Sequence, residues 1–537
     1  LPIYEVVGFL KNHLFIMPKT STDHLFQLIK SLSKAEKRSF KLYVNRLDNA
    51  GNNKYVRLFD YLDKTKEYDE KALSGKFEPN SQLSNLKAHL YKQILTSLRI
   101  QNAGKDTDIQ IREQLDYAKI LYKKGLYKQS LKVLDKAKTI AKRLFKNHLL
   151  FEIIEFEKHI ELQYITHSMS SRAEELTDES KNIAEITGKS SQYMNLALRL
   201  YGLYIKVGYV RNEKDVHMVR EFFDTNFSPP DIEKCSFYEK LHIYQAYMWY
   251  NYIIQDFLTC YRYSRKWVDL FTDNPEMTNI QTDIYLKGIH NLLSSLFMIR
   301  HYSRFSEVLE MLCNFEQQNA GKLDENNTLL LYMFIYVNRL NKHILEGTFT
   351  RGLEIIPQIE QFIETNRLKL DNHRILIFYY KMACLYFGHG DYKSAIRYLN
   401  EIINYKDVNL REDIHCFARI LNLISHYELQ NDELVEYQVR STYRFLVKME
   451  DMQTVQQHIF RFLRNLSYIQ PENLHREFKK LHQKLIKLKD DPYEKRPFLY
   501  LDIISWLESK MENRPVQEII HKKAVAEFGE LAKEAGT

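Results

Sequence analysis

The sequence predicts an all-α protein that is built from a long series of stacked helix pairs. Only 16 Gly and 11 Pro occur in 537 residues, whereas 37 Tyr and 30 Phe supply large apolar side chains. The apolar residues recur at helical spacing, and we find no convincing alternating strand pattern and no Asn-Gly hairpin turn between apolar runs. A turn also recurs every forty-odd residues, at positions 255, 303, 347 and 390, which is typical of helical repeats.

The clearest helix pair lies in the segment 379–404. Its turn has the sequence Gly-His-Gly-Asp at 388–391, and Gly390 stands where the first helix ends. Glycine accepts a positive φ at such a position without a Cβ clash. The apolar faces of the two helices are formed by Met382, Ala383 and Tyr386, and by Tyr392, Ala395, Ile396, Leu399 and Ile402. We therefore expect that replacing Gly390 with valine unfolds the array, through a positive-φ clash and poor packing.

This combination of small and aromatic residues around a Gly-Asp-Tyr turn resembles the tetratricopeptide repeat (TPR). A second copy at 118–140 matches it position for position, with Gly125 at the turn, and a third spans 346–359 with Gly347. Copies around Ser303 and Gln255 are weaker. The resemblance implies a right-handed superhelical α-solenoid. The spacing of the turns gives a period of about 43 residues, longer than the roughly 34 of the standard repeat. The additional residues would lengthen each helix by about one turn.

Charge divides the chain unevenly. Residues 1–104 hold 17 Lys and Arg against 10 Asp and Glu, whereas the remaining residues hold 60 against 59. We therefore expect a basic helical module at 17–104, a solenoid at 105–470 and C-terminal capping helices at 471–537. Residues 1–16 are set apart as an N-terminal extension or an artificial addition, because Met17 directly precedes a helix start signal.

Short signals place the helices of the N-terminal module. Ser33 and Glu36 have the spacing of a capping box, so a helix is expected to begin at Ser33. A helix around 55–62, a short one at 70–73 and a long one from Ser81 follow. The last two could form a helix-turn-helix. In that case the phosphate contacts would come from Lys87, Lys92 and Arg99, and the base contacts from Asn85, His89 and Gln93.

A superhelix of this kind has a concave groove that is lined by the first helix of each pair, and such grooves bind peptides or partner helices. The candidate groove-lining polar residues are Asn338, Arg339, Lys342 and Lys381. We expect a non-enzymatic scaffold or adaptor that binds a protein or peptide. The alternative is a peptide-responsive transcription regulator, in which the N-terminal module binds DNA.

Enzymatic function is not indicated. The sequence has no phosphate-binding loop, dinucleotide fingerprint, H-E-x-x-H or G-x-S-x-G motif, so no catalytic, cofactor-binding or metal-binding residues are expected. The five cysteines are scattered without a C-x-x-C motif, which favours a reducing compartment and hence the cytoplasm. No segment approaches the roughly 18 uncharged apolar residues of a membrane span.

Overall fold

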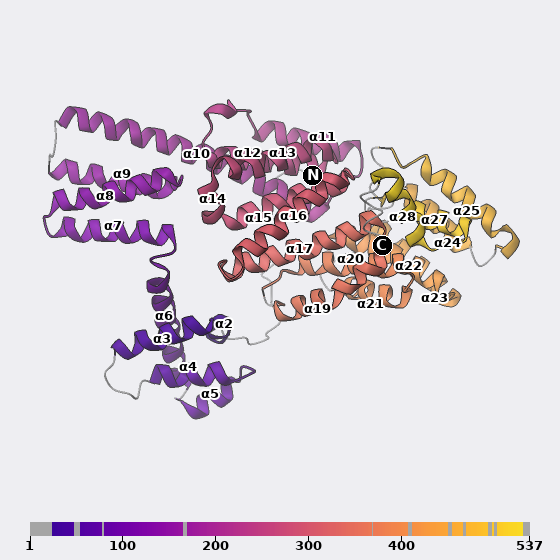
Figure 1. Ribbon diagram of the computed structural model, residues 1–537, viewed down its shortest axis with the longest axis horizontal. Coiled ribbons are helices and arrows are strands. Elements are labelled where there is room, and N and C mark those ends of the chain that lie inside the picture. Colours follow the sequence, from indigo (N-terminus) through magenta and orange to yellow (C-terminus); the bar gives the residue numbers. More distant parts are fainter. Residues whose placement is uncertain are drawn as a thin grey trace. The chain divides into compact units, whose positions relative to one another are not determined.

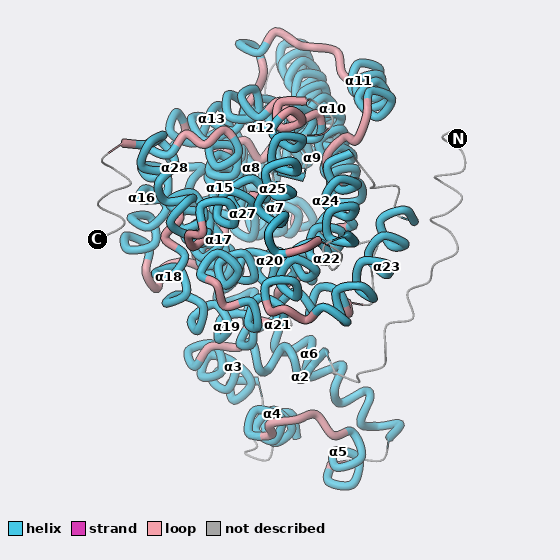
Figure 2. Tube along the Cα trace, turned by 90° about the vertical axis from the view of Figure 1, so that its right-hand side faces the viewer, coloured by secondary structure: helices cyan, strands magenta, loops and turns pink. Residues whose placement is uncertain are grey.

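The structure, a computed structural model, is helical throughout the part of the chain that it describes. It describes residues 24–47, 54–77, 80–164, 169–367, 369–405, 411–448, 454–465, 469–491, 494, 497–498 and 502–529. These residues form α-helices and short 3-10 helices and contain no strand (Figures 1 and 2). The all-α prediction is confirmed. The expected N-terminal extension at 1–16 lies outside the described residues.

The chain divides into two compact units, residues 1–177 and 178–537, which we call the first and the second unit. The described helices of the first unit are α2 (His24–Ser31), α3 (Lys34–Leu47), α4 (Lys54–Lys64), α5 (Glu70–Lys76), α6 (Asn80–Asn102), α7 (Thr107–Lys123), α8 (Tyr127–Arg143) and α9 (Asn147–Gln163). The next helix, α10 (Met169–Val207), begins in the first unit and continues into the second.

Helices α2 to α6 share a core of their own, which includes Ile29, Phe40, Phe59 and Ile94. The capping box predicted at Ser33 is present. Ser33 N donates to Glu36 Oε2 at 2.8 Å, and Glu36 N donates to Ser33 Oγ at 3.2 Å. These two bonds give acceptors to the backbone N–H groups of Ser33 and Glu36. At the start of a helix such N–H groups have no carbonyl acceptor within the helix.

In the second unit the helices pack consecutively along the chain, and the apolar faces of the helices from α13 to α28 form one large core (Figure 1). This consecutive packing is compatible with an α-solenoid. The helices after α10 are α11 (Glu213–Asn226), α12 (Phe237–Ile253), α13 (Phe257–Asp273), α14 (Pro275–Ile280), α15 (Thr282–Met298), α16 (Tyr302–Asn319), α17 (Glu325–Glu346), α18 (Phe349–Gly352), α19 (Ile356–Thr365), α20 (Asn372–His389), α21 (Tyr392–Ile403), α22 (Glu412–Glu428), α23 (Asp432–Lys448), α24 (Thr454–Asn465), α25 (Pro471–Ile486), α27 (Ile503–Glu512) and α28 (Val516–Phe528).

A residue with positive φ marks the turn inside most of the helix pairs. It is glycine at Gly347 and Gly390, with φ of 68° and 96°. At three further turns it is Gln255, Arg300 or Gln430, with φ of 64°, 55° and 57°. The turn predicted at Ser303 is wrong by three residues, because α16 already begins at Tyr302 and Arg300 makes the turn.

Gly390 has the predicted left-handed conformation, but one part of its expected role is wrong. A Cβ atom at this position would meet nothing within 4 Å. A side chain at Gly390 would therefore strain the backbone through the positive φ, without the close contact at Cβ that poor packing would require. At Gly347, by contrast, a Cβ would lie 2.5 Å from the backbone nitrogen of His521.

The last described helix, α28, returns along the second unit and packs against α17 and α20. Gln517 Oε1 accepts from Thr350 N at 2.9 Å, and Glu527 forms an ion pair with Arg300 at 2.8 Å. The ring of Phe528 stacks on Tyr302, with centroids 5.0 Å apart. These contacts connect residues that are far apart in the sequence. They hold α28 against Arg300 and Tyr302 at the turn before α16 and against Thr350 on α18. Among the described residues, no helix is both long and apolar enough to cross a membrane.

Candidate functional site

A groove of about 880 Å³ lies within the second unit. Its walls come from α10, α12, α15, α17, α20 and α22, and α28 adds Val516 and Ile520 near one end. Three of these helices, α15, α17 and α20, pack directly against one another in sequence. One part of the wall is therefore a continuous series of first helices from successive pairs.

One part of the groove is aromatic. The indole ring of Trp249 on α12 stacks on Tyr204 of α10, with centroids 5.3 Å apart, and lies 4.8 Å from Tyr201. Next to this cluster, Met194 and Leu198 on α10 leave 54% and 62% of their surface exposed. Apolar surface that is exposed inside a concave site marks a position where a ligand can be buried.

The other part of the groove is basic. Five of its lining residues are cations: Lys287, Arg300, Arg374, Lys381 and Arg411. The acidic lining residues are Asp283 and Asp502. Lys381 Nζ donates to Asn341 Oδ1 at 2.6 Å and lies 5.2 Å from the centre of the Phe297 ring. Burial, followed by the charge of Arg411, lowers the pKa of Lys381 to about 8.

Two histidines in the groove are held neutral. Burial, together with the charges of Arg374 and Lys381, lowers the pKa of His290 to about 3. Burial and Arg411 lower the pKa of His373 to about 3 as well. The His290 ring stacks on Phe334 at a centroid distance of 4.3 Å. At neutral pH both rings are therefore uncharged groups of the wall, and the positive charge comes from the lysines and arginines.

The four residues predicted to line the groove have different positions in the structure. Lys381 lines the groove, as described above. Asn338 is fully buried and its amide donates to Phe334 O at 2.8 Å, so the prediction that it lines the groove is wrong. Arg339 is exposed and Lys342 lies 3.7 Å from Glu346, and neither belongs to the lining. Asn341, which follows Asn338 on α17, was not among the predicted residues and lines the groove.

The residues predicted to contact DNA lie on α6, and several are engaged within the module. Lys87 Nζ lies 2.7 Å from Tyr68 Oη, His89 stacks on Tyr55, and Gln93 accepts from Tyr43 Oη at 3.0 Å. Arg99 forms an exposed ion pair with Asp116 at 3.5 Å. Asn85 and Lys92 are exposed.

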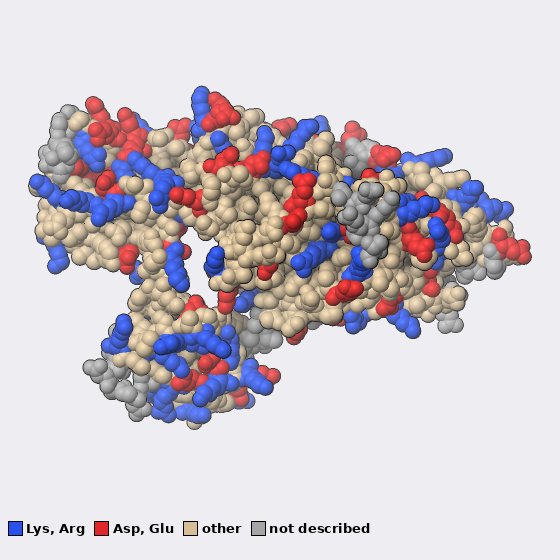
Figure 3. Space-filling model, in the orientation of Figure 1, with Lys and Arg blue, Asp and Glu red and all other residues tan. Residues whose placement is uncertain are grey.

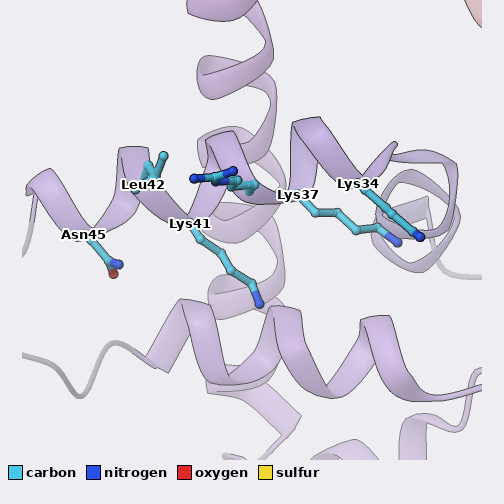
Figure 4. A pocket seen from close by; sticks show the side chains of 6 residues that line it. Lys34, Lys37, Lys41, Leu42 and Asn45 are labelled. Carbon is cyan, nitrogen blue, oxygen red and sulfur yellow. The ribbon is translucent and has the colours of Figure 1, made fainter.

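Lysines and arginines are spread over the visible surface of the N-terminal module (Figure 3), and one cluster of them lies on α3. Lys34, Lys37, Arg38, Lys41 and Asn45 line a hollow of about 350 Å³ along this helix (Figure 4). Lys37 and Lys41 pair with Asp63 and Asp60 of α4 at 2.7 and 2.6 Å. Lys34 and Arg38 are exposed.

No protein-family model matches the sequence, and a comparison with curated proteins finds no match. Within the described ranges, no three His, Cys, Asp or Glu residues are arranged to hold a metal ion. Burial raises the pKa of the Cys384 thiol to about 12, so this groove cysteine stays protonated at neutral pH and is a weak nucleophile.

Proposed function

We propose that this protein is a non-enzymatic scaffold, and that the groove of the second unit binds an extended peptide segment of a partner protein. The observation that carries the proposal is the lining of the groove: first helices of successive pairs present exposed apolar side chains, aromatic rings and a few polar groups to one concave surface. Sites with this composition bury most of a ligand and orient it through a small number of polar contacts.

We further propose that the helix pairs are TPR-like and wind into a right-handed superhelix. The left-handed turn residues support this, as does a contact that two pairs share. Ser130 Oγ donates to Ala118 O at 2.8 Å, and Cys260 Sγ donates to Met248 O at 3.2 Å. In both pairs a small side chain meets the facing helix twelve residues earlier in the sequence, at the spacing of Ala383 and Ala395. Small residues at these positions let two helix axes approach closely.

A peptide suits the groove because its backbone carries alternating donors and acceptors. Gln245 and Asn291 place amide side chains in the lining, and an amide group can both donate to and accept from a peptide backbone. The aromatic cluster around Trp249 then provides area for apolar side chains of the peptide. A helical partner would instead need a continuous apolar wall, whereas here cations and amides interrupt it.

The test is capture of peptides by the full chain from a random ten-residue pool, quantified by mass spectrometry. We expect saturable enrichment that falls at least tenfold when Trp249 is replaced with alanine. The matched control is Tyr437→Ala, because Tyr437 on α23 is 65% exposed and does not line the groove. Equal capture by both variants would show that peptides adhere elsewhere and would refute the proposal.

The basic surface on α3 supports a second candidate function, a peptide-responsive transcription regulator whose N-terminal module binds DNA. Protein contacts to phosphates release counterions, so their affinity falls steeply with salt. If α3 contacts DNA, the full chain should bind a 20-base-pair duplex more weakly in 200 mM than in 50 mM salt. The variant Lys34→Ser/Arg38→Ser should lower both the affinity and the salt dependence. Affinity that is insensitive to salt and to this variant would exclude the second candidate.

A further inference from the structure

We propose that α7 is an interface between two copies of this chain, which pack there as an antiparallel pair of helices. This surface belongs to the first unit, whereas the peptide groove lies within the second. Three features of α7 support a second copy as the partner: an exposed apolar strip, a position at the start of the helix pairs, and charges that are complementary to those of an identical helix.

The outward side of α7 is partly apolar. The helix packs against α8 and α9 and buries Ile111, Leu115 and Ala118. At about 3.6 residues per turn, Ile120 lies on the opposite side of the helix, and Tyr117 lies next to it, one turn earlier. Both side chains are large, and 52% and 46% of their surface is exposed. Exposed apolar surface that is bordered by charged residues is typical of a protein interaction site.

The position of α7 leaves this strip open. α7 is the first helix of the first clear pair, and it lies at the edge of the group that it forms with α8 and α9 (Figure 1). The preceding helix, α6, belongs to the core of α2 to α5 and reaches α7 through the exposed ion pair of Arg99 with Asp116 at 3.5 Å. Tyr117 and Ile120 remain exposed beside this ion pair. The terminal pair of a stacked array needs a cover for its outer face, and a second copy would supply one.

The charges on the same side of α7 fit an antiparallel partner. Glu113 precedes the apolar strip and Lys124 follows it, and both lie on the outward side of the helix with Ile120. The midpoint between these two charges along the helix is also the midpoint between Tyr117 and Ile120. A two-fold axis there places Tyr117 of each copy on Ile120 of the other, and Glu113 of each copy opposite Lys124 of the other. A parallel pair in register would instead bring like charges together, which disfavours it.

The size of this surface indicates how strong the association is. α7 has 17 residues, and a single pair of such helices lies at the low end of the roughly 1,200–2,000 Å² that stable interfaces bury. We therefore expect a dimer that forms at micromolar concentrations and dissociates on dilution.

The test is sedimentation equilibrium of the full chain at concentrations from about 1 to 200 µM. We expect the mass to rise with concentration from 64.4 kDa towards twice this value. Ile120→Glu should raise the dissociation constant at least tenfold, because it places a carboxylate on the ring of Tyr117 in the other copy. The matched control is Leu258→Glu, since Leu258 on α13 is 53% exposed and lies outside this surface. Both variants replace an exposed side chain, so their melting curves should match that of the unchanged protein.

A charge exchange at low salt tests the antiparallel arrangement. Glu113→Lys and Lys124→Glu should each weaken the association at least threefold, and their combination should restore it, which a loss of folding would not do. A mass that stays at 64.4 kDa over the whole concentration range overturns the proposal. Equal association of Ile120→Glu and Leu258→Glu overturns it as well, by placing the contact elsewhere. Failure of the combined variant to restore the association would refute the antiparallel pairing.

Discussion

Replacing Gly347 with alanine is expected to lower the free energy of unfolding of the second unit by about 2–5 kcal/mol. Gly347 has a φ of 68°, a conformation that costs any residue with a Cβ about 1–2 kcal/mol. The new Cβ would also lie 2.5 Å from His521 N and 2.9 Å from His521 Cα. Backbone atoms cannot rotate away as a side chain can, so α28 has to move from its place on α17 and α20.

The matched control for this change is Gly390→Ala. Gly390 also has a positive φ, of 96°, but a Cβ there would meet nothing within 4 Å. We expect the free energy of unfolding of this variant to fall only by the cost of a positive φ, about 1–2 kcal/mol. Urea unfolding gives the two stabilities, and hydrogen exchange of 516–528 reports on α28. Faster exchange of this segment in Gly347→Ala alone is the expected result, and identical behaviour of the two variants would contradict the packing of α28 described above.

The second large effect is a loss of stability in mild acid. The pKa values of His290 and His373 are lowered to about 3, chiefly because both rings are buried, whereas an unfolded histidine titrates near 6.5. Between these values the unfolded chain binds more protons than the folded one. Stability is therefore full above pH 6.5 and falls as the pH drops towards 3. Each histidine lowers the free energy of unfolding by about 1.4 kcal/mol per pH unit in this range. Together the two lower it by about 5 kcal/mol between pH 6.5 and 4.5.

Thermal unfolding at pH 7, 5.5 and 4.5 measures this effect. The double variant His290→Gln/His373→Gln cannot be protonated at these positions, so its melting temperature should fall less steeply with acid. His217→Gln is the control, because the His217 side chain is 81% exposed on α11 and its loss should leave the steepness unchanged. If all three proteins lose stability in parallel, groups other than the buried histidines cause the acid sensitivity.

The sequence identified the helix pairs most clearly where glycine makes the turn. Gly125, Gly347 and Gly390 mark the three clear copies, and all three have positive φ. At other turns, Gln255, Arg300 and Gln430 take the same left-handed conformation. A glutamine or arginine carries no signal for a left-handed turn. Such a residue is held in this unfavourable conformation because the packed helices on both sides fix the path of the chain.

The groove could be predicted only in part. The sequence places Lys381 among the polar residues of the first helix of a pair, and the structure places it in the lining of the groove. Asn338 and Asn341 are both asparagines on α17, and only the rotation of that helix in its packed position decides that Asn341 faces the groove. The return of α28 has no sequence signal either, since the partners Thr350 and Gln517 are 167 residues apart. Such contacts depend on how the whole second unit is folded.

The most direct test of the central claim, that the groove binds a peptide, is to locate a captured peptide on the protein. A peptide enriched from the random pool, resynthesised with a photoreactive diazirine side chain, is cross-linked to the full chain, and the attachment sites are read by mass spectrometry. We expect saturable cross-links to α12, α15, α17 and α20, which unlabelled peptide competes away. Cross-links confined to helices outside the groove, such as α3 or α23, or cross-links that do not saturate, would contradict it.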